Sequence, residues 1–171
     1  MRVIDFLAPD CIIAALQAKT KPAVLTELSG HLAKVVPGVE AEALRKVLEE
    51  REQLASTAIG DGIAIPHGKL DSVGRLVGAL GRAVDGIEFE SIDGKPTNLV
   101  FMLVAPASST GVHLKALARL SRLFRDGDFR KRLLDAPTGE AMYQVIVDED
   151  AKYYMIPSPA CGRGCRPEVG G

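Results

Sequence analysis

The sequence predicts an α/β fold in which helices pack against a β-sheet within a single domain. Asn98–Ala105 is a nearly continuous apolar run, which is typical of a central strand covered on both faces. Apolar residues recur at three- and four-residue spacing in 21–36 and 40–54, which indicates helices with one buried side. The chain of 171 residues is long enough to bury the core of one such domain.

The first part of the chain predicts a strand followed by two helices. Cys11–Leu16 is short and apolar and contains β-branched residues, which favours a strand. Thr20 is suited to cap a helix that ends at Pro37 and Gly38, and a second helix is expected at 40–54. The residues expected to be buried by these two helices are Val24, Leu25, Leu28, Leu32, Val35, Leu44, Val47 and Leu48.

The second part predicts the rest of the sheet and three more helices. Arg75–Val84 indicates a strand, and Asp93–Pro96 is a strong turn signal before the central strand. Helices are expected from about Gly111 to the break at 126–128, over Phe129–Leu134 and from Thr138 onward, all packed against the sheet. Their expected inward residues are Leu114, Leu117, Ala118, Ser121, Phe124, Met142, Val145 and Ile146.

Composition separates a domain of residues 1–150 from a flexible tail of residues 151–171, which has too few apolar residues to order itself. Cys11, Cys161 and Cys165 do not have the spacing of a zinc site, and an odd number of cysteines fits a reducing compartment, so a cytoplasmic protein is expected. The formal net charge of −1 argues against a nucleic-acid binder. No apolar run reaches the roughly 20 residues of a membrane span, so no membrane insertion is expected.

Residues 56–69 are interpreted as a shaped turn that presents His67. Gly60, Gly62 and Gly68 permit backbone angles closed to other residues and close approach of a ligand. Pro66 stiffens the segment beside the histidine. The alternative interpretation is a glycine-rich turn that contains a histidine by chance.

Three other motif interpretations fail on their spacing. Between Gly62 and Gly68 lie five residues where a P-loop has four, and Leu70 replaces the hydroxyl that holds Mg²⁺. The dinucleotide-binding pattern lacks its third glycine. A zinc site on His67 and His113 has no third ligand nearby, so neither a metal nor another cofactor is expected.

The remaining chemistry is a histidine that accepts a phosphoryl group. A neutral imidazole is a competent nucleophile at physiological pH, and phosphoryl transfer requires mainly positioning and positive charge. Arg51 lies on the apolar side of its predicted helix, where it either caps the helix or faces an anion. His113 is expected in the first turn of a helix, a place suited to anions.

In combination, these segments closely resemble the IIA component of the fructose/mannitol class of the bacterial phosphoenolpyruvate-dependent phosphotransferase system, and most of all its nitrogen-regulatory branch. The resemblance spans roughly residues 3–147 and rests on Arg51-Glu52, on 56–69 and on His113-Leu114. It implies a mixed β-sheet flanked by helices. It also implies that His67 is phosphorylated by an HPr-like carrier, that Arg51 stabilises the phosphate and that His113 is the second active-site histidine. The residues expected to bind phosphate are Ser56, Thr57, Gly60, Gly62 and Gly68.

The resemblance leaves the use of the phosphoryl group open. A nitrogen-type IIA is a switch whose phosphorylation state selects its partners, commonly potassium-transport and stress-signalling proteins such as sensor kinases. A sugar-specific IIA passes the group to a IIB component for uptake of fructose or mannitol. The long match over 56–69 favours the switch. In a third class the domain only binds partners, which the presence of Arg51, His67 and His113 together argues against.

Overall fold

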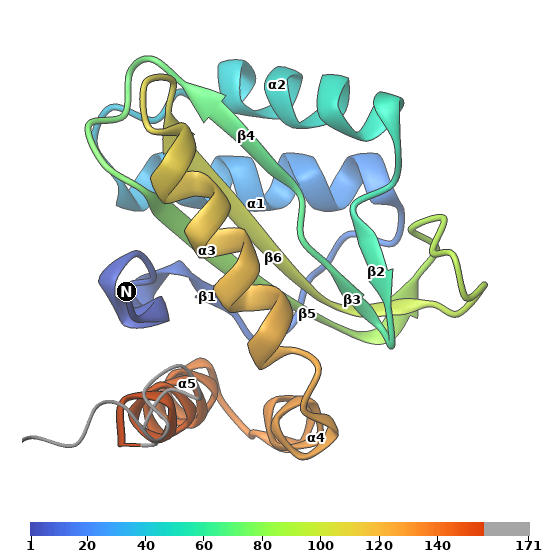
Figure 1. Cartoon of the computed structure of the whole chain (residues 1–171). Helices are drawn as coiled ribbons and strands as arrows, with labels where there is room; N and C mark the ends of the chain where they lie inside the picture. Colours follow the sequence, from blue (N-terminus) through green and yellow to red (C-terminus); the bar gives the residue numbers. More distant parts are fainter. Residues whose placement is uncertain (156–171) are drawn as a thin grey trace, which may run out of the picture.

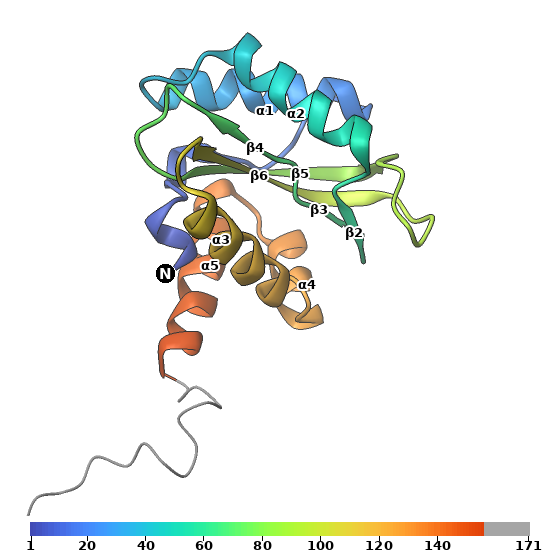
Figure 2. The same cartoon turned by 45° about the horizontal axis from the view of Figure 1, so that its top comes forward.

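The computed structural model describes residues 1–155 and shows a mixed β-sheet between two layers of helices (Figures 1 and 2). Two helices cover one face of the sheet and three lie on the other. The expected fold class, an α/β domain with a mixed sheet flanked by helices, is therefore confirmed. The helices are α1 (Lys21–Val35), α2 (Ala41–Leu54), α3 (Thr110–Leu123), α4 (Gly127–Asp135) and α5 (Gly139–Met155).

The sheet is built around one long buried strand. The strands are β1 (Ile12–Ile13), β2 (Ala58–Gly60), β3 (Ile63–Ala64), β4 (His67–Leu70), β5 (Val77–Ile87) and β6 (Thr97–Pro106). Their order is β1-β5-β6-β3-β2, and β4 also pairs with β6. The β5–β6 pair is antiparallel, whereas β3 and β4 run parallel to β6. All seven residues of Leu99–Ala105 are buried, as expected for a central strand.

The predicted strand over Cys11–Leu16 is shorter than expected. Only Ile12 and Ile13 pair with β5 as a strand. Beyond them Arg82 donates from Nε to the carbonyl of Ala14 at 2.8 Å, and the N–H of Leu16 donates to the carbonyl of Arg82 at 2.9 Å. Thr20 caps α1 as predicted, accepting a hydrogen bond from the N–H of Ala23.

The segment interpreted as a turn before His67 is mostly strand, which corrects the prediction. Asp61 and Gly62 have positive φ angles of 57° and 79° and form a two-residue connection between β2 and β3. Paired positive angles of this kind are typical of a type I′ hairpin, and an Asp-Gly pair is its usual sequence signal. His67 begins the following strand, so its backbone is held by sheet pairing rather than by a loop.

Helix α3 presents a different face to the core than predicted. His113, Ala116, Leu120 and Leu123 are its buried residues. Leu114, which was expected to face inward, is 62% exposed. The sequence offers two apolar stripes one position apart, and contact with β6 selects the stripe that contains His113.

Carboxylates hold the C-terminal helices, one exposed at the start of α4 and one buried in α5. Asp126 caps α4 and accepts hydrogen bonds from the N–H groups of Asp128 and Phe129, as the predicted break requires. Asp150 of α5 pairs with Arg119 at 3.0 Å. Helix α5 continues to Met155, past the predicted start of the tail near residue 151.

The rest of the predicted tail, with Cys161 and Cys165, lies outside the described residues. Within residues 1–155 no helix has the length and apolar character needed to cross a membrane.

Candidate active site

His67 lies at the start of β4, a strand in which buried residues alternate with more exposed ones. Gly68 and Leu70 are buried, whereas His67 is half-buried and Lys69 is exposed. A Cβ atom on Gly68 would lie 2.5 Å from Cγ1 of Val47, so the glycine lets α2 pack directly on β4. His67 and Lys69 therefore project on the side of the strand opposite α2.

The ring of His67 is oriented by its own strand. Nδ1 lies 2.8 Å from the carbonyl oxygen of Ile65, and a carbonyl only accepts, so Nδ1 carries the proton. In the neutral ring this leaves the lone pair on Nε2. Burial lowers the pKa of His67 below its ordinary 6.5, and the nearby charge of Arg51 lowers it further, against the opposing effect of the hydrogen bond to Ile65. His67 is therefore neutral at pH 7.

His113 lies beside His67, as the sequence predicts for its place in the first turn of α3. The two ring centroids are 5.3 Å apart, and the rings meet edge to face at 73°. His113 is only 6% exposed, and among the described residues its Nε2 has no hydrogen-bond partner. Burial, followed by the charges of His67 and Lys69, lowers the pKa of His113 to about 4. His113 is therefore neutral at pH 7, and its ring contacts His67 without adding a charge.

Arg51, in the last turn of α2, fits both interpretations of its position. Its Nη1 donates to the carbonyl of Ala55 at 2.9 Å, which caps the helix. Its charge also acts on His67 and lowers the pKa of that ring. One side chain thus ends α2 and supplies positive charge at the proposed nucleophile.

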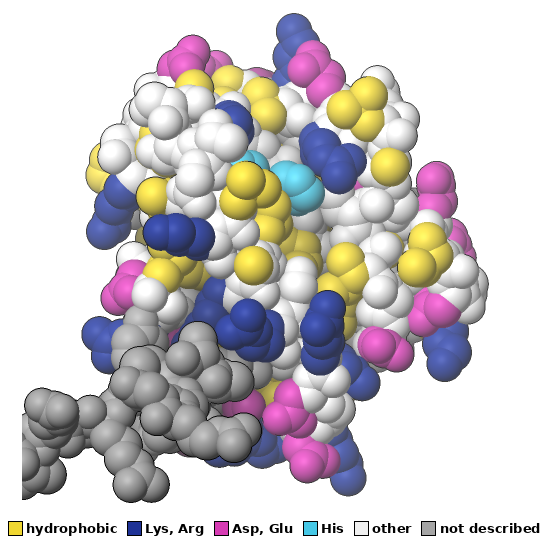
Figure 3. All heavy atoms as spheres, in the orientation of Figure 1, with side chains coloured by type: hydrophobic (Ala, Val, Ile, Leu, Met, Phe, Trp, Pro, Cys, Tyr) yellow, Lys and Arg dark blue, Asp and Glu magenta, His cyan; other side chains and the backbone are white. Residues whose placement is uncertain are grey.

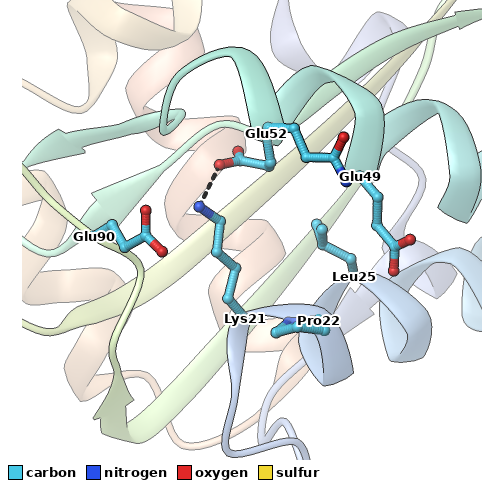
Figure 4. A pocket seen from close by; sticks show the side chains of 7 residues that line it. Lys21, Pro22, Leu25, Glu49, Glu52 and Glu90 are labelled. Atoms are coloured by element: carbon cyan, nitrogen blue, oxygen red, sulfur yellow. Dashed lines mark ion pairs between the residues drawn. The ribbon is translucent and has the colours of Figure 1, made fainter.

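The turn after Arg51 is held by a buried carboxylate, Glu52, whose structural part the sequence interpretation missed. Glu52 accepts hydrogen bonds from the N–H and from the hydroxyl of Thr57 and pairs with Nζ of Lys21 at 2.7 Å. Figure 4 shows this pair beside a pocket of about 440 Å³ between the ends of α1 and α2. Glu52 therefore fixes the chain between Arg51 and β2.

The residues expected to bind phosphate lie at different places relative to His67. The hydroxyl of Ser56 donates to the carbonyl of Phe89 at 2.7 Å, and that of Thr57 to Glu52. The N–H of Ile65 donates to the carbonyl of Thr57 at 3.0 Å, so Thr57 lies beside the segment that leads to His67. Gly60 ends β2, and Gly62 belongs to the two-residue turn before β3. In the sheet, Ile63 is opposite Leu99 and His67 opposite Leu103, and four residues of strand span about 13 Å. Gly60 and Gly62 therefore shape the hairpin away from His67, whereas Gly68 adjoins the histidine.

Lys69 is a residue near the two histidines that the sequence interpretation did not single out. Its Nζ lies 2.9 Å from Oγ1 of Thr110, the first residue of α3. The signal for it was the two-residue spacing from His67, which places both side chains on one side of a strand. The two-residue spacing has this meaning only in a strand, and the sequence analysis interpreted the segment as a turn.

The surface around the histidines combines apolar and basic side chains. Figure 3 shows histidine side chains with hydrophobic, Lys and Arg side chains gathered close by. Val112 and Leu114 are 41% and 62% exposed. Helix α3 carries Lys115, Arg119 and Arg122 and no Asp or Glu. This face suits a protein partner that contributes apolar contacts, with its reactive group next to His67.

Comparison with known proteins identifies the family of this chain. Residues 5–149 match the family described as "Phosphoenolpyruvate-dependent sugar phosphotransferase system, EIIA 2". The chain belongs to this family. Its resemblance to the fructose/mannitol class of IIA components is thereby confirmed.

Two relatives of this EIIA 2 chain represent the two branches. A "Nitrogen regulatory protein" of Bradyrhizobium diazoefficiens is 42% identical over 146 residues, which cover 85% of this chain and 95% of that protein. A "PTS system fructose-specific EIIABC component" of Bacillus subtilis is 37% identical over 150 residues, which cover 88% of this chain but 24% of that protein. The solved structure of nitrogen regulatory protein IIA-Ntr from Neisseria meningitidis has 28% identity and a TM-score of 0.79, with 84% of this chain and 98% of that chain covered.

Proposed function

We propose that the chain is a phosphocarrier and regulatory IIA protein that receives a phosphoryl group on Nε2 of His67 from an HPr-like carrier. The observation that carries this proposal is the state of the His67 ring. Its Nδ1–H is committed to the carbonyl of Ile65, and its pKa is lowered by burial and by the nearby charge of Arg51. Within residues 1–155 its second nitrogen has no hydrogen-bond partner, and a second histidine, His113, lies beside the ring.

The transfer follows from this arrangement. The lone pair of Nε2 attacks the phosphorus of the carrier's phosphohistidine. The new P–N bond forms as the carrier's P–N bond breaks, and the electron pair of that bond returns to the carrier's imidazole. His67 keeps its proton on Nδ1, so the Ile65 carbonyl stabilises the positive charge that the ring acquires.

Arg51 and His113 act on the transferring group. Arg51 supplies positive charge to the phosphoryl oxygens, as its influence on His67 indicates. His113 is neutral and buried, so it offers a hydrogen bond without a charge that would need a counter-ion. In this proposal Gly60 and Gly62 bind no phosphate, because the β2–β3 hairpin lies about 13 Å along the sheet from His67.

The regulatory use is favoured by the relatives. The Bradyrhizobium protein named as nitrogen regulatory matches over nearly its whole length, which supports a IIA that acts as a separate switch, with potassium-transport or sensor-kinase proteins as candidate partners in the cytoplasm. Sugar uptake through a IIB component is the second candidate, because the fructose-specific relative is nearly as similar.

Reconstitution tests the acceptor. The protein is incubated with phosphoenolpyruvate, the first enzyme of the system and an HPr-like carrier, and phosphate incorporation is followed with ³¹P NMR to assign the ring nitrogen. We expect one phosphate on Nε2 of His67 and none in His67→Ala. Undiminished labelling of that variant would remove His67 from the mechanism. A pull-down that compares unmodified with phosphorylated protein then separates the switch from the relay.

A further inference from the structure

Lys69 is a cation on the same side of β4 as His67, the proposed phosphorylation site. It is two residues from His67 on β4, and the burial pattern places both side chains on the same side of the strand. From there its ammonium reaches the start of α3, where Nζ contacts Oγ1 of Thr110 at 2.9 Å. His113 belongs to the same first turn of α3.

The present partner of Lys69 does not account for its charge. Thr110 offers a neutral hydroxyl, and no ion pair among the described residues includes Lys69. The N-terminus of α3 carries the positive end of the helix dipole, which disfavours a cation there. Three sources of positive potential, Arg51, Lys69 and the helix end, thus converge near His67 and leave the site suited to an anion.

A buried polar atom of His113 also indicates that an anion binds at this site. Nε2 of His113 is without a hydrogen-bond partner among the described residues, although the side chain is only 6% exposed and its ring contacts His67. Buried polar groups are normally satisfied, so such an atom is explained by a group that binds there in another state of the protein.

We propose that Lys69 is a second cation of the phosphoryl site, whose ammonium leaves Thr110 and binds the phosphoryl oxygens on His67. This inference rests on the proposed function. A phosphoryl group brings a charge near −2 and three acceptor oxygens, which exceeds what the single charge of Arg51 neutralises. Lys69 supplies the second charge, and its contact with Thr110 holds it close by until the phosphoryl group arrives.

The competing explanation is structural, because the contact between Lys69 and Thr110 also ties β4 to α3. Variants separate the two roles. Lys69→Met removes the charge and keeps the length, Lys69→Arg keeps a charge, and Thr110→Val removes the contact but keeps Lys69. Lys115→Met is the matched control, because Lys115 is an exposed lysine of α3, the helix that Lys69 contacts through Thr110.

The experiment measures the rate of His67 phosphorylation by phosphoramidate, a small donor that requires no docking of a carrier protein. We expect Lys69→Met to slow labelling by about 10- to 100-fold and to speed hydrolysis of the phosphohistidine. Lys69→Arg retains most of the rate because it keeps the charge. Thr110→Val and Lys115→Met stay within about twofold of the wild type, as expected for groups that do not bind the phosphoryl group.

Two outcomes overturn the inference while the proposed function stands. One is a wild-type rate and hydrolysis in Lys69→Met. The other is an equal loss in Thr110→Val and Lys69→Met, which would assign Lys69 to the contact between β4 and α3. Failure of the wild-type protein to accept phosphate on His67 from either donor would instead remove the proposed function itself.

Discussion

Replacement of Glu52 by alanine should unfold the connection that positions Arg51. Glu52 is 5% exposed, and its three partners are the N–H and hydroxyl of Thr57 and the ammonium of Lys21, which is 14% exposed. Removal of one partner from a buried ion pair costs about 3–5 kcal/mol. Lys21 keeps its position 5.0 Å from the ring centre of Phe89 and opens to a pocket, so the lower end of that range, about 3 kcal/mol, is expected.

Urea unfolding measures this loss, and thermal unfolding should show a decrease of about 6–12 °C for a chain of this size. Lys21→Met is the companion variant, because it leaves Glu52 buried without its cation. The double variant Glu52→Ala/Lys21→Met should be less destabilised than the sum of the single variants, since the two residues contact each other. A loss below about 1 kcal/mol in Glu52→Ala, the range of exposed ion pairs, would refute the reasoning that this carboxylate holds the turn.

Two further predictions concern the site. Arg51→Ala should slow labelling of His67 by about 100-fold, because charge at the transferring group is lost, while the lost cap costs only about 1 kcal/mol of stability; an unchanged rate would leave Arg51 with the capping role alone. The pH dependence should show two effects. Labelling by phosphoramidate should stay constant above pH 6.5 and decline only below it, because the pKa of His67 is lowered; a decline between pH 8 and 7 would contradict this. His113 binds its proton less readily when folded, so its contribution to stability is complete above pH 6.5 and is lost as the pH falls toward about 4. The urea midpoint should therefore decrease as the pH falls from 6.5 toward 4, and this decrease should be smaller in His113→Leu, which lacks the titrating ring.

The two stretches that sequence reasoning interpreted least well are both places where local pattern was ambiguous. The Asp61-Gly62 pair is a hairpin signal, but three glycines within nine residues favoured a loop, so the strand that carries His67 and Lys69 was missed. Helix α3 has apolar residues on two adjacent stripes, and sequence periodicity could not decide which one faces β6.

The sequence by itself determined the family and the class of fold, and it predicts His67, Arg51 and His113 as the site, because capping residues, apolar periodicity and a specific motif are local properties of the chain. The tertiary structure decided which groups share a site. It set the alternation of β4, which brings Lys69 to the start of α3, and it placed Gly60 and Gly62 in the β2–β3 hairpin away from His67. The physical reason is that the direction of a side chain depends on strand register and on the helix that packs against it, and both arise from contacts between distant parts of the chain.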